Sequence, residues 1–168
     1  MTTAVFPGSF DPITLGHLDI IKRASTMFEK LIVAVFEPPE GKCLFSTEER
    51  MVMASEATSQ IPNVKVEKFQ GLIVDFAHNK GAQVMLRGLR LNTDFEYEFE
   101  MALMNRNLAP DLDVVCLITS LQYQYVRSSL IKEVASLKGD ISQLVPDGVS
   151  TALAKRFGSP SHPSIKEN

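Results

Sequence analysis

The stretch PGSFDPITLGH, residues 7–17, combines residue types that a phosphate-binding loop needs. Gly8 permits close approach of a ligand to the backbone, Ser9 adds a hydroxyl, and the following residues predict a helix that begins near His17. The N–H groups and the dipole at the start of a helix favour an anion. A histidine there can donate Nε2–H to a phosphate oxygen and stabilise charge that grows in a transition state. The alternative is a histidine that only packs against the start of the helix.

Two arginines form the second candidate, because Arg87 and Arg90 bracket Gly88 directly after the apolar run AQVML. A guanidinium fork suits phosphate oxygens better than a lysine ammonium does. Arginines in a loop are more often a solvated surface, but their place directly after an apolar strand favours anion binding here.

Five short apolar runs predict the strands that position these loops: TAVF (3–6), LIVAVF (31–36), VKVEKF (64–69), AQVML (82–86) and VVCLIT (114–119). Helical patterns separate them at residues 17–28, 47–59, 72–79 and 94–107, and a further helical pattern follows the last strand at 128–137. This alternation predicts an α/β fold, with a Rossmann-like open five-stranded parallel sheet and helices on both faces. Ligands bind such sheets beyond the carboxyl ends of the strands, so the loops at 7–17, 37–45, 87–94 and 119–129 are the candidate site.

The chain is expected to form one domain over residues 1–157, followed by a polar tail over residues 158–168. Residues 141–157 are predicted to form a C-terminal helical cap. Ser46 and Glu49 have the spacing of a capping box at the start of the helix at 47–59.

Composition and charge exclude several classes of function. The 168 residues carry 17 basic and 20 acidic side chains, which is too little positive charge for non-specific nucleic-acid binding. No apolar run approaches the roughly 20 residues of a membrane span, so no membrane partner is expected. The N-terminus lacks the pattern of a secretory signal, and Cys43 and Cys116 lack paired metal-ligand spacing. A cytoplasmic location is therefore expected.

Several motifs resemble those of a known family. TLGH at 14–17 matches the [TH]xGH signature of a nucleotidyltransferase superfamily that transfers a nucleotide from ATP or CTP and releases pyrophosphate. Together with PGSFDPITLGH, the motifs RGLR (87–90), DFEYE (94–98), MN (104–105) and SSLIKEVA (128–135) resemble, in order, those of the bacterial phosphopantetheine adenylyltransferases. The resemblance covers residues 3–157.

This resemblance implies a reaction. The 4′-phosphate of phosphopantetheine would attack the α-phosphorus of ATP, giving dephospho-coenzyme A and pyrophosphate in a late step of coenzyme A biosynthesis. Such a transfer depends on positioning and charge neutralisation and needs no covalent nucleophile. The family implies Mg²⁺ as cofactor, held mostly by phosphates and water, so no protein ligand is expected. It also implies a homohexamer built from two trimers, with coenzyme A as a feedback inhibitor.

The resemblance also assigns roles to residues. His17 would stabilise the transition state. The acceptor would be bound by Ser9, Gly41, Lys42, Ile73 and Arg87. ATP would be bound by Ser9, Phe10, His17, Gly88, Leu89, Arg90, Glu98, Tyr123, Gln124, Tyr125, Val126, Arg127, Ser128 and Ser129. Without the family, Glu98 is a charge on a helix surface, Ser128 a helix cap and Ile73 a core residue.

The chain departs from the family pattern at two points that bear on the site. In an ungapped match the usual lysine of the second-strand loop falls on Gly41, with Lys42 one position later. The long side chain of Lys42 can compensate for that shift, and we expect it to act. The usual triple serine is Arg127-Ser128-Ser129 here, so Arg127 either adds charge near the triphosphate or points into a subunit contact.

Two other functions are compatible with the sequence. One is a nucleotidyltransferase with another acceptor, such as nicotinamide mononucleotide or a polyol phosphate, which Arg87 and residues 71–75 should discriminate. The other is a nucleotide-sensing or scaffold protein on the same fold. His17, Arg87 and Arg90 argue against a protein without catalytic activity.

Overall fold

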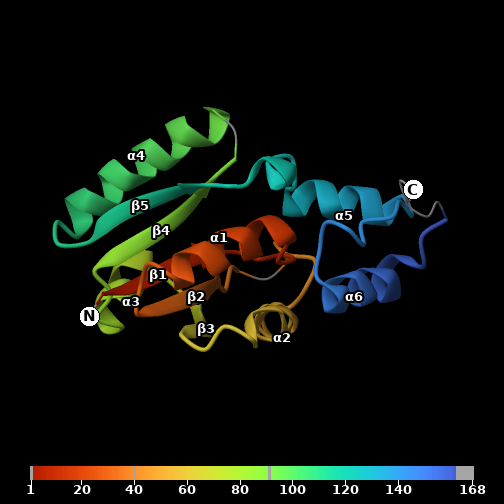
Figure 1. Cartoon of the computed structure of the whole chain (residues 1–168), viewed down its shortest axis with the longest axis horizontal. Helices are drawn as coiled ribbons and strands as arrows, with labels where there is room; N and C mark the ends of the chain where they lie inside the picture. Colours follow the sequence, from red (N-terminus) through yellow and green to blue (C-terminus); the bar gives the residue numbers. More distant parts are fainter. Residues whose placement is uncertain (1, 40, 91, 162–168) are drawn as a thin grey trace.

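A parallel sheet of five strands lies at the centre of the fold. The structure is a computed structural model that describes residues 2–39, 41–90 and 92–161. The strands are β1 (Thr3–Gly8), β2 (Lys30–Phe36), β3 (Val64–Phe69), β4 (Val84–Leu89) and β5 (Asp113–Ile118). They lie in the order β3-β2-β1-β4-β5, with every neighbouring pair parallel (Figure 1). The predicted open five-stranded parallel sheet is thereby confirmed.

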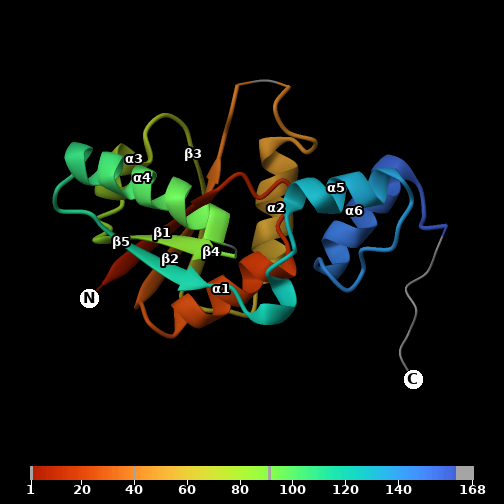
Figure 2. The same ribbon diagram turned by 90° about the horizontal axis from the view of Figure 1, so that it is seen from above.

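Helices cover both faces of this sheet. On one face lie α1 (Leu15–Ser25) and α2 (Thr47–Thr58), and on the other lie α3 (Ile73–Asn79) and α4 (Asn92–Leu108) (Figure 2). The period-two alternation of strand side chains produces two cores. In β1, Phe6 joins a cluster with residues of α1 and α2, whereas its neighbour Val5 packs with Val74 and Ala77 of α3.

The C-terminal part lies beyond one end of the sheet. It contains a 3₁₀ turn η1 (Leu121–Tyr123), α5 (Ser128–Ser136) and α6 (Asp147–Phe157) (Figures 1 and 2). Ile131 of α5 and Leu153 of α6 are both 1% exposed and belong to the same core cluster as Phe6. The predicted cap thus packs against the same core as the sheet, and its helix occupies residues 147–157 of the predicted 141–157. Ser161 donates its N–H to the carbonyl of Lys138, and the rest of the predicted tail, residues 162–168, lies outside the described residues.

The local signals at helix starts differ in how well they predicted the structure. The Ser46–Glu49 capping box is confirmed, because each side chain accepts the other residue's backbone N–H. Ser128, in contrast, is not a helix cap: Arg127 occupies the N-cap position, and the Ser128 hydroxyl donates to the carbonyl of Pro12, 2.8 Å away.

Two strands are longer than their apolar patterns. Pro7 and Gly8 were predicted to begin a loop, but they continue β1 and pair with Ala34 and Val35 of β2. Arg87, Gly88 and Leu89 were predicted to lie in a loop, but they continue β4 and pair with Cys116, Leu117 and Ile118 of β5. The ladder with β5 extends β4 past the apolar run that ends at Leu86, so Arg87 projects from a fixed backbone. Among the helices within the described ranges, none is long and apolar enough to cross a membrane.

Candidate active site

The candidate site lies where the strand order reverses. From the central β1 the chain moves outward to β2 and β3, and it then returns to the other side of β1 with β4 and β5. The segments that follow β1 and β4 therefore leave the carboxyl edge of the sheet in different directions and open a crevice. Gly8 and Ser9 line this crevice from the first strand, and Arg87 and Gly88 line it from the fourth.

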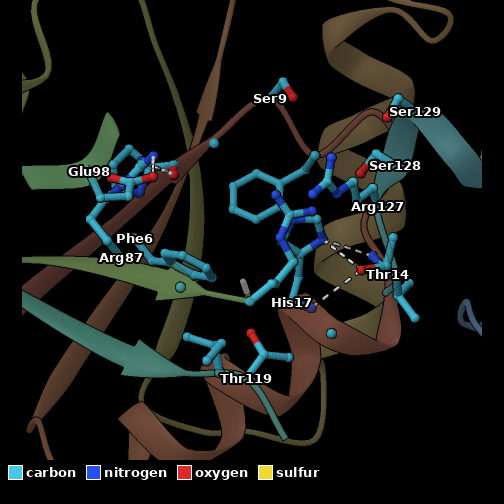
Figure 3. Close-up of a pocket in the computed structure, with 18 residues that line it drawn as sticks. Phe6, Ser9, Thr14, His17, Arg87, Glu98, Thr119, Arg127, Ser128 and Ser129 are labelled. Carbon is cyan, nitrogen blue, oxygen red and sulfur yellow. Dashed lines mark hydrogen bonds and ion pairs between the residues drawn. The ribbon is translucent and has the colours of Figure 1, made fainter. Parts of the chain in front are cut away.

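His17 is held at the start of α1 by a capping box. The N-cap residue Thr14 donates its backbone N–H to His17 Nδ1 at 3.1 Å, and the Thr14 hydroxyl accepts the His17 N–H at 3.4 Å (Figure 3). An Nδ1 that accepts a backbone N–H carries no proton. In the neutral ring the proton is therefore on Nε2, so the nitrogen remote from the cap is a hydrogen-bond donor.

Burial keeps this histidine neutral. Burial, together with the positive charges of Arg90 and Arg87, lowers the pKa of His17 from 6.5 to about 4. At neutral pH the side chain is thus an uncharged donor with a fixed tautomer. This state suits a group that stabilises negative charge without giving up its proton.

Phe10 fixes the other side of the histidine ring. The two rings meet edge-on with centroids 5.1 Å apart, and Phe10 is 1% exposed. Its backbone φ of 46° lies in the left-handed region, which is strained for an aromatic residue and occurs where the surroundings enforce it. A Cβ at Gly8 would lie 3.1 Å from the Phe10 ring, so the glycine leaves space for this packing.

Arg87 is oriented by a carboxylate on α4. Its Nε and Nη2 both donate to Glu98 at 2.6 Å, and Nη1 donates to the carbonyl of Pro7 at 3.1 Å. The pair is bidentate and half-buried, the geometry in which an arginine loses the least freedom. In Figure 3 this pair lies on one side of the pocket and Ser128 and Ser129 lie on the other, with His17 between them.

Two cavities meet at this edge of the sheet. The first has a volume of about 430 Å³, and its lining is mainly polar or small side chains. It brings together these predicted site residues: Ser9, Phe10, His17, Arg87, Gly88, Arg90, Glu98, Val126, Arg127, Ser128 and Ser129. Of the two alternatives for Arg127, the structure places it in this cavity wall.

The second cavity has a volume of about 540 Å³ and is largely apolar. Ile73 lines it, together with Leu72 and Val74 at the start of α3 and residues of α4. It shares Pro7, Gly8, Ser9, Arg87 and Glu98 with the polar cavity. The Arg87–Glu98 pair thus lies at the junction of a polar space and an apolar one.

Some predicted residues lie apart from both cavities. Gly41 and Lys42 line a separate depression of about 330 Å³ beside α2, and the Lys42 side chain is exposed. Leu89 and the segment 123–125 line neither main cavity. Tyr123 instead packs near Gly16, where an added Cβ would lie 3.5 Å from the tyrosine Cβ.

Sequence reasoning missed several residues of the site. On α4, Tyr97, Met101, Met104 and Leu108 line the apolar cavity, and their i, i+4, i+7, i+11 spacing was a signal that could have identified this face. Arg50 is 1% exposed and donates to the carbonyls of Ser9 and Phe36 at 2.6 and 2.8 Å.

For Arg50, the sequence contains no spacing pattern comparable to that of α4 that could have identified it as a site residue. It brings together the ends of β1 and β2, which lie far apart in the sequence and become neighbours only through the sheet topology.

The donor groups of the site do not form a carboxylate cage. In the part of the chain that the structure describes, no three His, Cys, Asp or Glu side chains cluster as metal ligands. The carboxylate in the polar cavity, Glu98, is engaged by Arg87. These side chains fit a metal ion only as one carried by bound phosphates.

Comparisons with known proteins agree with this geometry. The profile of the cytidylyltransferase-like family matches residues 5–134. The fold is similar to a solved structure described as a nicotinate-nucleotide adenylyltransferase from Vibrio parahaemolyticus, with a TM-score of 0.68, 18% identity and 94% of each chain covered. The match over residues 5–134 places the chain in the cytidylyltransferase-like class of nucleotidyltransferases, and the solved structure shares its fold.

Curated relatives give the particular family. A protein of Thermomicrobium roseum named phosphopantetheine adenylyltransferase is 53% identical over 157 residues, covering 92% of this chain and 94% of the relative. One of the same name from Levilactobacillus brevis is 53% identical, covering 94% and 98%. The chain belongs to the phosphopantetheine adenylyltransferase family, a family of nucleotidyltransferase enzymes.

Proposed function

We propose that the chain transfers AMP from ATP to 4′-phosphopantetheine, giving dephospho-coenzyme A and pyrophosphate. The observation that carries this proposal is the junction of a polar and an apolar cavity at Ser9 and the Arg87–Glu98 pair, beside a neutral histidine. A long, uncharged pantetheine arm suits the apolar cavity, and a triphosphate suits the polar one. The acceptor phosphate would then lie at their junction.

Arg87 is the residue we assign to the acceptor phosphate. Its Nε and Nη2 face Glu98, and its Nη1 faces the carbonyl of Pro7, so its guanidinium plane is fixed before substrate arrives. A pre-oriented cation holds the attacking phosphate with little further loss of freedom. Ile73 and the apolar residues of α4 would contact the pantetheine arm.

His17 and Arg90 are the residues we assign to the reacting phosphates. Negative charge grows on the non-bridging oxygens of the α-phosphate as the acceptor oxygen attacks and pyrophosphate leaves. His17 Nε2–H donates to that charge, and the guanidinium of Arg90, across the same cavity, neutralises the β- and γ-phosphates. No proton transfer from His17 is needed, in keeping with its pKa of about 4.

The start of α5 supplies further donors on the ATP side. Arg127, Ser128 and Ser129 line the polar cavity at the N-terminus of a nine-residue helix. Its free N–H groups and dipole favour the leaving pyrophosphate. Mg²⁺ would enter with ATP, bound by phosphate oxygens and water, and would reduce the charge of the triphosphate.

One experiment tests this function against its alternatives. The purified protein is incubated with MgATP and, in separate reactions, 4′-phosphopantetheine, nicotinamide mononucleotide, nicotinate mononucleotide or glycerol 3-phosphate, and pyrophosphate is measured. Release with phosphopantetheine alone is the expected result. Release with another acceptor instead would assign a different adenylyl transfer, and no release with any acceptor would favour a nucleotide-sensing protein.

Three further properties belong to the same proposal. Coenzyme A would compete at the site, because it contains both the pantetheine arm and an adenine nucleotide. The protein would act in the cytoplasm, where both substrates are available. It would assemble as a homohexamer, for which the exposed apolar face of α4 is the first candidate contact.

A further inference from the structure

A buried carboxylate ties together three segments that surround the candidate site. Asp11 is 3% exposed and lies in the segment between β1 and α1. Its Oδ1 accepts the N–H of Phe45 at 3.0 Å, and its Oδ2 accepts the N–H of Leu44 at 3.0 Å. The same Oδ2 accepts Lys132 Nζ of α5 at 2.5 Å. One side chain therefore joins the loop after β1, the loop after β2 and helix α5.

Each joined segment carries part of the proposed site. The loop after β1 contains Ser9 and leads to His17, and the loop after β2 contains Lys42, assigned to the acceptor. Helix α5 begins with Ser128 and Ser129, which line the polar cavity. Asp11 touches none of the cavity residues through its carboxylate and lines neither cavity. Asp11 therefore holds these three segments together from outside the cavities.

Two polar contacts link the segment between β1 and α1 to helix α5. Ser128 donates to the carbonyl of Pro12 at 2.8 Å, one turn before Lys132 reaches Asp11. A hydroxyl bond alone allows the helix to pivot, whereas a second contact one turn along the helix fixes its direction. In addition to the core packing of Ile131, Lys132 thus gives the first turns of α5 a second polar attachment to the segment between β1 and α1.

The electrostatic state of Asp11 agrees with a permanent ion pair. Burial raises the pKa of its carboxyl, but the hydrogen bond from Lys132 and those from Leu44 and Phe45 outweigh it, so that the pKa is lowered. The carboxylate is therefore charged when buried, and removal of Lys132 leaves that charge with backbone donors only.

We propose that Asp11 and Lys132 form a positioning pair that holds the acceptor-side loop after β2 and the ATP-side helix α5 in the relative placement needed for in-line transfer. This proposal rests on the proposed function, which assigns the loop after β2 to the acceptor and α5 to ATP. Neither residue contacts a substrate. The pair acts through Leu44 and Phe45 on one side and through Ser128 on the other.

The test separates turnover from binding. In Lys132→Met we expect kcat to fall about tenfold or more, because each substrate still binds but the two are misaligned. The KM for ATP and for the acceptor should stay within about threefold of the wild type. Lys132→Arg, which keeps the charge, should restore most of kcat. The matched control is Lys155→Met, an exposed lysine of α6, and its kcat should equal that of the wild type.

A double-variant cycle tests whether the two residues act as one unit. Asp11→Asn combined with Lys132→Met should be no slower than the slower single variant. The proposal would be overturned by losses of kcat that add in the double variant, by a Lys132→Arg variant that does not recover kcat, or by an unchanged kcat in Lys132→Met. A loss of kcat no larger than the fraction of unfolded protein, measured by circular dichroism, would also overturn the proposal.

Amide hydrogen exchange provides a readout that needs no turnover. Exchange of the Leu44 and Phe45 amides should be at least about tenfold faster in Lys132→Met than in Lys155→Met. If exchange of these amides is faster in Lys132→Met but the wild type uses no acceptor, the proposed function is wrong, whereas the structural link through Asp11 and Lys132 is supported. If the wild type turns over and neither exchange nor kcat changes, the pair fails and the function stands.

Discussion

At the residue scale, the site depends on a histidine whose tautomer is set by its own helix cap. Thr14 N–H points at His17 Nδ1, so the ring presents Nε2–H as its donor. The same contact closes the capping box that starts α1. The side chain that closes the helix cap is therefore the one to which we assign the transition-state role, and a histidine that packs at the start of the helix is compatible with that role.

Removal of this donor should affect turnover far more than folding. His17→Ala is expected to lower kcat by about 10²-fold or more, because a single transition-state donor typically contributes that much. Steady-state pyrophosphate release measures it, with His78→Ala on α3 as the control. Full turnover in His17→Ala would remove the role assigned to this residue.

The depressed pKa of His17 predicts how stability depends on pH. The folded value of about 4 lies below the ordinary 6.5, so the unfolded chain takes up a proton first as the pH falls. This contribution to stability is complete above about pH 6.5 and is lost as the pH falls toward 4. Between pH 7 and 5 it amounts to about 2 kcal/mol.

Urea unfolding at fixed protein concentration checks this prediction. The free energy of unfolding of the wild type should fall between pH 7 and 5 by about 2 kcal/mol more than that of His17→Gln, which has no titrating ring. Equal pH dependence in the two proteins would show that His17 is not kept neutral by the fold.

At the element scale, the rigid ladder of β4 and the helix α4 together position Arg87. Glu98→Gln on α4 should raise the KM for the acceptor about tenfold, because a neutral amide replaces a bidentate carboxylate partner. Glu100→Gln, an exposed neighbour on the same helix, is the control. A larger rise in the KM for ATP would instead support the direct ATP contact that the resemblance implies for Glu98.

The loop after β2 provides a second prediction at this scale. Lys42 lies in a depression separate from the two main cavities, so it reaches the acceptor only by extension of its side chain. Lys42→Ala is expected to raise the KM for the acceptor several-fold more than the KM for ATP. Lys65→Ala on β3 is a control for loss of a surface charge. An unchanged acceptor KM would show that Lys42 does not compensate for the shift from position 41.

At the scale of the whole molecule, the sequence predicted topology better than local boundaries. The five apolar runs were sufficient for the sheet, because period-two and period-3.6 patterns are local. Arg87 was placed in a loop because its strand pairing depends on β5, distant in sequence. Asp11 and Arg50 were missed for the same reason: their partners come from loops that only the folded sheet brings together.

The outer surface of α4 gives the last prediction. Phe95, Phe99 and Leu103 are each more than half exposed and follow an i, i+4, i+8 spacing, and the two phenylalanine rings stack at 6.0 Å. This stripe is distinct from the one that lines the apolar cavity, so substrate binding does not cover it. An apolar stripe of this kind is costly in water and is typical of a contact between subunits.

If this stripe is a contact within the proposed hexamer, light scattering should give a mass six times the 18.6 kDa of one chain, and Phe99→Glu should lower it. A buried glutamate without a partner opposes association much more strongly than it perturbs an exposed helix surface. Val52→Glu on α2 places the same charge at another exposed apolar residue and should leave the mass unchanged. A wild-type mass of one chain would contradict the hexamer and assign this stripe to solvent or to another partner. An unchanged hexamer mass in Phe99→Glu would show that the hexamer uses a different contact.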